Sequence, residues 1–331
     1  MKLVSFEYIS ELLPIEGADK IELARIQGWQ SVVKKGDYKV RDRIIFIPID
    51  TVIEPAEWNQ FLWDKKNPTK PIRIKTAKLR GTISQGVIFP TSITNITEEE
   101  QLPEALKVSK YEKPIPAHLA GQVAGDFPTH LVSKTDEDNL KSNIDTLEEL
   151  READFVEVTV KIDGTSATYI KELDGTFRAC SRNLELKDTE SNVHWQMARK
   201  YNIQENLRPG YAIQGEISGP GIQGNPAGYS EVNLKVFNAF DLQDRRPIAR
   251  DRWDLAFADI PYVDHYGLLF RGEFAKMSID DLQGLANKQL YDNQTPAEGL
   301  VFRGIKDGKL MYSKTLQKML SVKIINQNYK D

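Results

Sequence analysis

Hydrophobic and polar positions alternate most regularly between residues 156 and 162. The apolar positions are Val156, Val158, Val160 and Ile162, and the polar positions between them are Glu157, Thr159 and Lys161. A period of two predicts a β-strand with the valines on one face and Lys161 on the other. Asp163-Gly164 follows as a turn signal. Burial among apolar neighbours disfavours a charged amine, so we expect a lowered pKa and a nucleophilic lysine; the alternative is an edge-strand lysine before a hairpin turn.

Short apolar segments separated by Gly, Pro or charged residues fill the first hundred residues. They lie at 32–33, 43–49, 72–74 and 86–90. Several short strands at this spacing predict a small β-barrel. A charged, proline-containing stretch follows, and then Leu140, Ile144, Leu147 and Leu150 recur at helical spacing. We therefore divide the chain into a barrel at 1–100, a connector at 101–125 and a second domain at 126–331.

Composition narrows the class of protein. The 331 residues are 40% hydrophobic and include a single cysteine, Cys180. That length suggests roughly two domains, and the lone cysteine excludes an intramolecular disulfide and favours a cytoplasmic or other reducing compartment. The sequence contains no apolar run of about 18 residues, the length that a membrane span needs, and the N-terminus does not resemble a secretory signal.

Charge and histidine content restrict the ligands. The net charge of −4 argues against a protein that coats nucleic acid, but it is compatible with a local basic groove. Four histidines and one cysteine show no zinc-type spacing. We expect any metal to be bound by carboxylates and phosphates, which favours Mg²⁺ or Mn²⁺.

A basic cluster with interleaved aromatic residues lies in the predicted barrel. Its members are Lys65, Lys66, Lys70, Arg73, Lys75, Lys78 and Arg80, beside Trp58, Phe61 and Trp63. Such a set can follow a phosphate backbone and stack bases, so we expect RNA contacts from Lys65, Lys66, Lys70 and Arg73. The alternative is a solvated loop whose aromatic side chains belong to the barrel core.

The barrel resembles the tRNA-binding OB modules appended to some aminoacyl-tRNA synthetases. The resemblance covers about a third of the chain, and the matching residues are 13–23, 39–42 and 79–89. The stretch from Trp58 to Thr69 departs from that pattern as an insertion.

Five segments downstream of Lys161 carry further chemistry. They are 179–186 with Arg182, 214–221 with Glu216, 232–242 with Phe237 and Phe240, 298–303 with Glu298, and 320–325 with Lys323. A guanidinium can bind a phosphate through two hydrogen bonds, and a buried carboxylate needs a partner that ribose hydroxyls can supply. Each residue alone also fits an ordinary surface or core position.

Taken in order, these segments resemble the covalent nucleotidyltransferase superfamily of ATP-dependent ligases and mRNA capping enzymes. The motifs are Lys-x-Asp-Gly, Ser-Arg-Asn, Gly-Glu, Phe-Asp, Glu-Gly-x-Val and Val-Lys-Ile, over roughly 127–331. The resemblance implies that Lys161 attacks the α-phosphate of ATP and carries AMP. Val160 would offer backbone groups to adenine, and Gly164 belongs to the nucleotide site. Asp163 and Glu298 would hold the metal through water.

The remaining motifs imply further nucleotide contacts. Arg182 would contact the phosphate or ribose, Glu216 the ribose hydroxyl, and Lys323 the α-phosphate. Phe240 would stack on adenine, with Phe237 as the alternative that alternation alone does not exclude. Members of the superfamily often carry a second lysine two residues before the last one, where this chain has Ser321.

The order of the domains indicates which branch of the superfamily the chain resembles. DNA ligases and capping enzymes usually carry an OB domain after the last lysine motif, and only eight residues follow Lys323. A barrel before the catalytic core, with Phe127-Pro and the Lys-Thr-Asp-Glu run at 134–137, resembles RNA ligases with an N-terminal OB domain. The arginine that usually follows that run is absent, since Asp138-Asn139 stand there.

We therefore expect an α+β protein, an OB-like barrel followed by a nucleotidyltransferase core of antiparallel sheets flanked by helices and unrelated to ATP-grasp. We expect an ATP-dependent RNA ligase that seals nicked or paired RNA ends, uses Mg²⁺ or Mn²⁺ and needs no protein partner. The alternatives are another covalent nucleotidyltransferase, either a GTP-using capping enzyme or a DNA ligase, and a non-catalytic RNA-binding protein.

Overall fold

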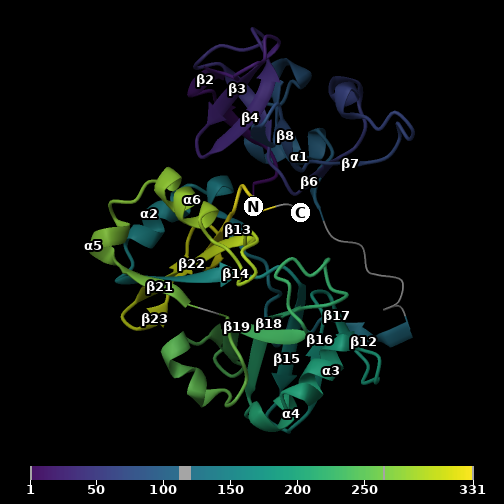
Figure 1. Cartoon of the computed structure of the whole chain (residues 1–331), viewed down its shortest axis with the longest axis vertical. Helices are drawn as coiled ribbons and strands as arrows, with labels where there is room; N and C mark the ends of the chain where they lie inside the picture. Colours follow the sequence, from purple (N-terminus) through teal and green to yellow (C-terminus); the bar gives the residue numbers. More distant parts are fainter. Residues whose placement is uncertain (1, 112–120, 264, 330–331) are drawn as a thin grey trace. The chain divides into compact units, whose positions relative to one another are not determined.

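A computed structural model describes residues 2–111, 121–263 and 265–329, and the chain divides into two compact units, Met1–Pro114 and Ile115–Asp331 (Figure 1). Each unit has hydrophobic cores of its own. Part of the predicted connector at 101–125 is not a connector: Leu102 and Val108 are buried in the core of the first unit, because α1 (Leu102–Ala105) and β11 (Val108–Lys110) fold onto it.

The first unit is built from short antiparallel strands, as its apolar segments predict. The strands are β1 (Ser5–Tyr8), β2 (Glu11–Pro14), β3 (Ile21–Ile26), β4 (Trp29–Lys34), β5 (Arg43–Ile47), β6 (Thr51–Ile53), β7 (Ile72–Arg73), β8 (Thr76–Leu79), β9 (Thr82–Gln85), β10 (Val87–Pro90) and β11. The 3₁₀ turns are η1 (Glu57–Leu62), η2 (Thr91–Ile93) and η3 (Glu99–Gln101). The strands of this unit pair in the orders β1-β5-β10, β2-β3-β4, β11-β6-β7 and β8-β9.

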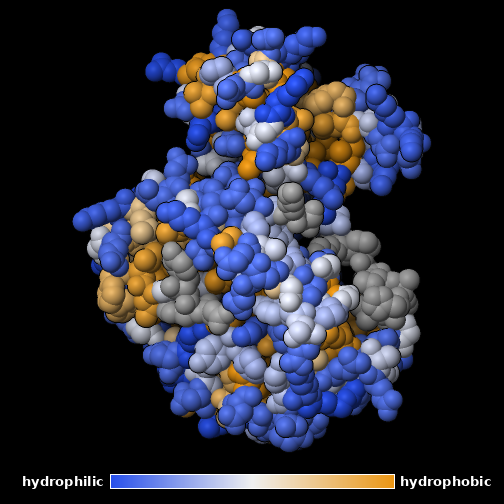
Figure 2. Space-filling view, viewed as in Figure 1, coloured by the Kyte–Doolittle hydropathy of each residue, from blue (hydrophilic) through white to orange (hydrophobic). Residues whose placement is uncertain are grey.

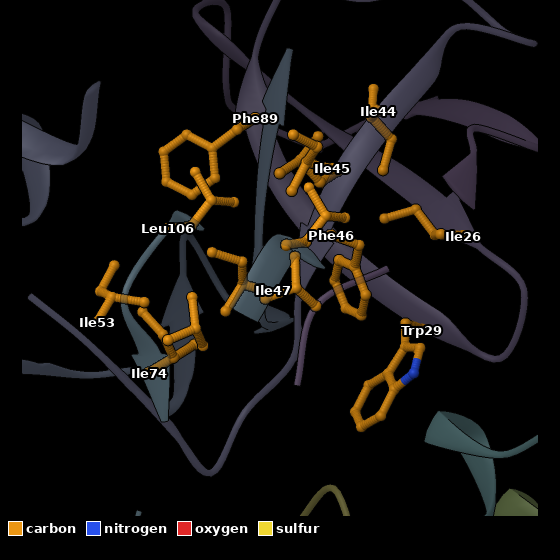
Figure 3. Close-up of a cluster of buried hydrophobic side chains, with 14 of the residues drawn as sticks. Ile26, Trp29, Ile44, Ile45, Phe46, Ile47, Ile53, Ile74, Phe89 and Leu106 are labelled. Atoms are coloured by element: carbon orange, nitrogen blue, oxygen red, sulfur yellow. The ribbon is translucent and has the colours of Figure 1, made fainter. Parts of the chain in front are cut away.

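Strand β5 runs through the middle of the core of this unit. Its residues Ile44 to Ile47 are all 2% exposed or less, so both faces of the strand are covered (Figure 3). Trp29 packs against Phe46 with ring centroids 5.8 Å apart. Four consecutive large apolar residues buried in one strand are a main source of the stability of this unit.

The second unit contains two larger sheets. The seven-stranded sheet has the order β12 (Val123–Asp126), β17 (Leu184–Leu186), β16 (Phe177–Cys180), β15 (Thr165–Lys171), β18 (Tyr211–Ser218), β19 (Asn233–Asp241) and β20 (Arg246–Pro247). The six-stranded sheet has the order β13 (Asp138–Asn139), β26 (Ser321–Ile325), β22 (Gly299–Lys306), β14 (Phe155–Lys161) and β21 (His265–Phe270), and β23 (Lys309–Leu310) pairs with β22. A small ladder joins β24 (Tyr312–Ser313) to β25 (Lys318–Met319).

Helices cover one face of each of these sheets. Side chains from η5 (Leu140–Ser142), α2 (Asp145–Arg151), α5 (Arg271–Phe274) and α6 (Ile279–Asn287) share a core with the six-stranded sheet. Those from α3 (Val193–Lys200), α4 (Ile203–Asn206) and η6 (Arg250–Leu255) share a core with the seven-stranded sheet. The helix predicted from Leu140 to Leu150 is interrupted at Asn143, whose φ of −141° is not helical.

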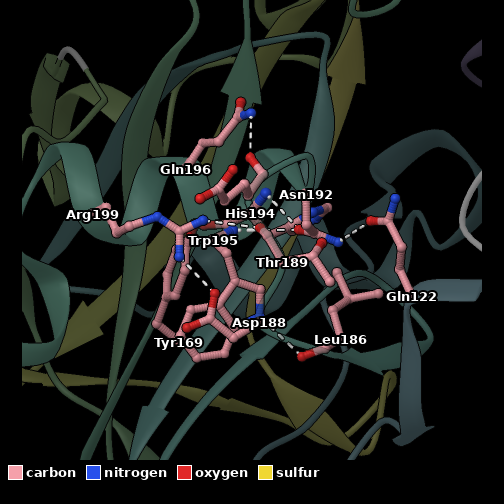
Figure 4. A network of polar contacts seen from close by, with 11 residues as sticks. Gln122, Tyr169, Leu186, Asp188, Thr189, Asn192, His194, Trp195, Gln196 and Arg199 are labelled. Carbon is pink, nitrogen blue, oxygen red and sulfur yellow. Dashed lines mark hydrogen bonds and ion pairs between the residues drawn. The ribbon is translucent and has the colours of Figure 1, made fainter.

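A polar network fixes α3 against the seven-stranded sheet (Figure 4). The Asn192 side chain accepts hydrogen bonds from the backbone of His194 and Trp195 and donates to Gln122 Oε1 at 2.7 Å. The buried Tyr169 hydroxyl donates to the His194 carbonyl at 2.8 Å. Residues 121–126 are thereby tied to the second unit.

Hydrophilic residues cover most of the surface seen in Figure 2, in keeping with a charged fraction of 28%. Across the described ranges, the helices are all too short or too polar to cross a membrane.

Candidate active site

The first element of the site is the face of the six-stranded sheet opposite its helices. Val156 and Val158 are fully buried in the core on the helix side, as the alternation predicts. Glu157, Thr159 and Lys161 therefore lie on the other face.

The strand register places both motif lysines on this face. Lys161 pairs with Gly299, Thr159 pairs with Val301, and Val301 pairs in turn with Lys323. Paired residues of antiparallel strands share a face, as do residues two apart along a strand. Lys161 and Lys323 thus emerge on the same face from strands separated only by β22, as the sequence predicts.

Arg303 links this face to the seven-stranded sheet. The residue is 5% exposed, and its guanidinium donates to the Phe237 carbonyl at 2.5 Å and to Ser321 Oγ at 3.1 Å and lies 3.4 Å from Glu137. The serine at the position where the superfamily often has a lysine therefore supports an arginine from the neighbouring strand. The sequence analysis did not single out Arg303. An arginine within an apolar strand nevertheless indicates that its buried charge has a hydrogen-bond or ion-pair partner.

The Lys161 ammonium forms an ion pair with Glu298. Nζ lies 2.7 Å from Glu298 Oε2, and the two side chains are 23% and 18% exposed. Burial disfavours the charge of the amine, but the carboxylates of Glu298, Glu216 and Asp163 outweigh burial and raise the pKa of Lys161 above its ordinary value. The expected lowering of this pKa is wrong for the free protein, because three acidic side chains surround the amine.

Glu216 approaches from the seven-stranded sheet. It pairs with Ser166 on one side and Lys235 on the other, at the end of the sheet where β15 begins. Gly164 makes this approach possible: a Cβ there would lie 2.2 Å from the Ile217 carbonyl and 3.0 Å from Glu216 Cγ. The Lys-x-Asp-Gly motif thus needs glycine for packing.

Asp163 and Glu298 are joined through a tyrosine that the sequence did not single out. The Tyr291 hydroxyl accepts from the backbone N–H groups of Asp163 and Glu298 at 3.1 and 3.3 Å. It lies 3.2 Å from the Lys161 carbonyl, to which it donates. A second tyrosine, Tyr329, donates to Asp163 Oδ2 at 2.5 Å.

These two carboxylates suit a hard divalent cation. Among the described residues, no group of three or more His, Cys, Asp or Glu side chains could hold a metal by itself. A cation here would need oxygens from a phosphate or water in addition to those of Asp163 and Glu298, and such an all-oxygen set fits Mg²⁺ or Mn²⁺.

Both candidate aromatics lie on β19, where a bulge interrupts the pairing. Gly215 pairs with Val236 and Gln214 with Asn238, so Phe237 is the extra residue. Phe240 pairs with Ala212, on the face that carries Glu216, and is 6% exposed in a cluster with Phe127 and Val132. Phe237 is half-buried.

Arg182 lies just after β16, with Nη2 3.3 Å from Asp136 Oδ1 and its side chain 44% exposed. Val160 packs its side chain toward the helix-side core, so only its backbone can serve the opposite face. Asn139, the second residue after the Lys-Thr-Asp-Glu run, pairs with Lys323 through β13.

The basic cluster of the first unit is only partly available to a ligand. Lys65, Lys66 and Lys70 are exposed. Arg73 lies 3.2 Å from Asp50 and stacks over Tyr111 at 3.7 Å, so its guanidinium has partners within the protein. Of the aromatics, Trp58 packs on the core whereas Phe61 is 71% exposed.

Comparison with known proteins agrees with this architecture. An OB-fold domain family matches residues 3–91, and a family described as RNA ligase matches residues 154–315. A search of curated proteins found no match.

Several solved structures match almost the whole chain. An aspartate-to-alanine variant of Naegleria gruberi RNA ligase, described as apo, is 30% identical with a TM-score of 0.80, over 98% of this chain and 96% of that one. A lysine-to-alanine variant with ATP and Mn has the same identity and TM-score, over 98% and 97%. The N. gruberi enzyme with PPi is 30% identical with a TM-score of 0.79, over 98% and 97%. The chain belongs to the RNA ligase family.

Proposed function

We propose that this protein is an ATP-dependent RNA ligase that joins a 3′-OH to a 5′-phosphate through a lysyl-AMP and an RNA-adenylate. The observation that carries the proposal is the Lys161–Glu298 pair, on the sheet face that also bears Lys323. A nucleophile, a carboxylate and a second cation gathered at one site suit phosphoryl transfer, which depends mainly on positioning and charge stabilisation.

The first step consumes ATP. The Lys161 amine, after losing a proton, attacks the α-phosphorus; a P–N bond forms and the P–O bond to pyrophosphate breaks. Lys323 stabilises the charge on the α-phosphate, and Arg182 contacts the phosphate or ribose. In the second step an oxygen of the RNA 5′-phosphate displaces Lys161, and in the third the 3′-OH displaces AMP.

The remaining residues orient the nucleotide. Glu216 accepts from the ribose hydroxyls, adenine stacks on Phe240 or, as the alternative, on Phe237, and the Val160 backbone meets the base edge. Gly164 leaves room for Glu216.

Deprotonation of Lys161 is the costly part of the first step, because three carboxylates favour its charged form. Asp163 and Glu298 are the residues that would hold a divalent cation, and a bound cation supplies positive charge that counters both these carboxylates and the phosphates.

The first unit would contribute to binding of the RNA substrate. Lys65, Lys66 and Lys70 are exposed and near Phe61 in the sequence, which suits contact with phosphates and a base. A protein partner is not part of the proposal.

Sealing of a defined panel of nicked duplexes, each strand in turn RNA or DNA, tests the proposal. We expect sealing with ATP and Mg²⁺ or Mn²⁺ when the strands at the nick are RNA. Sealing only of all-DNA nicks would identify a DNA ligase. Salt-dependent RNA binding without sealing of any nick would support the non-catalytic alternative.

A further inference from the structure

The Tyr291 hydroxyl uses its entire hydrogen-bonding capacity on three residues of the candidate active site. A phenol has one donor and two acceptor positions. Its proton goes to the Lys161 carbonyl at 3.2 Å, and it accepts from the N–H groups of Asp163 at 3.1 Å and Glu298 at 3.3 Å. One side-chain atom therefore ties the backbone of the nucleophile to the backbone of both carboxylates.

Tyr291 is itself held firmly. It is 5% exposed and packs with Ala227 and Ala297, with Val160 at the edge of the same cluster. Packing of the ring in this cluster holds the hydroxyl in place between Lys161, Asp163 and Glu298.

Tyr329 extends this arrangement to the Asp163 side chain. Its hydroxyl donates to Asp163 Oδ2 at 2.5 Å, and its ring packs in the same cluster as Tyr291. The Tyr329 N–H bonds to the Asn326 carbonyl at 3.1 Å, and the Asn326 N–H bonds to the Glu298 carbonyl at 2.9 Å. Tyr329 is thereby anchored to the strand end that carries Glu298.

We propose that Tyr291 and Tyr329 are positioning residues for lysine adenylylation: Tyr291 fixes the backbone at Lys161, Asp163 and Glu298, and Tyr329 fixes the Asp163 carboxylate. The inference rests on the proposed function. In-line attack needs the amine within about 0.5 Å of its productive position, so loss of this support slows the chemical step rather than nucleotide binding.

Tyr291→Phe in the full-length protein tests the first half, since it removes one oxygen and keeps the ring. We expect the rate of lysine–AMP formation at saturating ATP to fall by about 10- to 100-fold, the range for loss of a supporting hydrogen bond at a site. The KM for ATP should change by less than about threefold, because the nucleotide contacts remain. Amide hydrogen exchange at Asp163 and Glu298 should speed up, as both N–H groups lose their acceptor.

Tyr329→Phe tests the second half. Without its hydrogen bond Asp163 can turn, so we expect the Mn²⁺ concentration that gives half-maximal adenylylation to rise by about 10-fold or more, again the range for a lost supporting contact. The rate at saturating Mn²⁺ should stay nearer the wild-type value. An unchanged or lower Mn²⁺ requirement would overturn the role of Tyr329.

Tyr169→Phe is the matched control. The Tyr169 hydroxyl is also buried and hydrogen-bonded, but it donates to the His194 carbonyl, on the helix-covered face of the seven-stranded sheet. We expect it to lower the melting temperature without changing the adenylylation rate. A wild-type protein that forms no lysine–AMP would overturn the proposed function. If the wild type becomes labelled and Tyr291→Phe has the wild-type adenylylation rate and wild-type amide exchange, only the positioning role of Tyr291 is overturned.

Discussion

Lys161 Nζ lies 2.7 Å from Glu298 Oε2 although 137 residues separate them in the chain. The contact follows from strand pairing: β14 ends with Lys161 opposite Gly299, and Glu298 comes immediately before that glycine. Gly299 has a φ of +153°, and a Cβ there would lie 2.1 Å from the Ile324 carbonyl. Glycine at this position therefore lets β22 pass close to β26 and carry the carboxylate to the amine.

Gly164→Ala should separate Glu216 from the nucleophile. The added Cβ would collide with the Ile217 carbonyl at 2.2 Å, and backbone cannot give way as a side chain can. We expect a loss of 1–3 kcal/mol in the free energy of unfolding, roughly the cost of overpacking, and a large fall in adenylylation, measured by denaturant unfolding and AMP transfer to the protein.

Gly284→Ala is the control for that substitution. Gly284 lies in α6 with nothing within 4 Å of an added Cβ. Alanine should stabilise the helix by about 0.5–1 kcal/mol. If Gly164→Ala labels and unfolds like the wild type, the close approach of β15 and β18 does not matter for the site.

The choice between Phe240 and Phe237 can be settled by nucleotide affinity. Phe240→Leu should raise the KM for ATP about 10-fold, because a stacking contact with a base is worth roughly 1–3 kcal/mol. Since Phe240 is packed against Phe127 and Val132, the stacking also requires that this cluster open toward the base.

Phe237→Leu is the reciprocal variant and should leave the KM for ATP near the wild-type value. The reverse result, with affinity lost only in Phe237→Leu, would assign the stacking to the half-buried ring at the bulge. Melting temperatures of both variants show whether the change in KM reflects lost packing instead.

Much of the fold and site follows from periodicity and motif order. Alternation at 156–162 correctly predicts which face of β14 carries Lys161, and the apolar segment at 43–49 correctly predicts a strand, β5. These features depend on neighbouring residues along the chain, where local pattern is informative.

The features that sequence reasoning missed depend on distant contacts. Burial lowers the pKa of Lys161, but the carboxylates of Glu298 and Glu216, which are distant in the sequence, contribute to a net increase. Tyr291 and Arg303 gain their roles from partners that no spacing rule connects to them. The bulge at Phe237 likewise breaks the alternation on which a sequence-based choice relies.

Because His194 is buried, we expect the protein to lose stability at acidic pH. It is 2% exposed, and burial lowers the pKa of its imidazole to about 4, whereas the unfolded chain titrates near 6.5. Between these two values the unfolded chain binds more protons, so the free energy of unfolding decreases as the pH falls from 7.5 to 4. The group accounts for about 3 kcal/mol of that decrease.

Denaturant unfolding of the wild type and His194→Gln at pH 7.5 and 5.0 measures this effect. The glutamine variant should be less stable at pH 7.5 but lose less stability on acidification. Equal losses in the two proteins would show that other groups cause the acid sensitivity.

Neutralising Lys65, Lys66 and Lys70 together to glutamine should weaken RNA binding and flatten its salt dependence. Each lysine that contacts a phosphate releases counterions, so the slope of log affinity against log salt should fall by about 2–3 for a duplex. Arg73 is left intact because it is paired with Asp50 within the protein. Adenylylation of Lys161 should be unchanged, and an unchanged RNA affinity at every salt concentration would remove these lysines from the RNA-binding surface.

Transfer of radiolabel from ATP to the protein tests whether Lys161 takes AMP from ATP. With [α-³²P]ATP and Mg²⁺ or Mn²⁺, the wild type should become labelled and release pyrophosphate, with the AMP on Lys161. Lys161→Ala should acquire no label, and [α-³²P]GTP should label the wild type far less than ATP. Absence of label on the wild type with either metal, or undiminished label on Lys161→Ala, would contradict the account, and labelling by GTP alone would point to a capping-type enzyme.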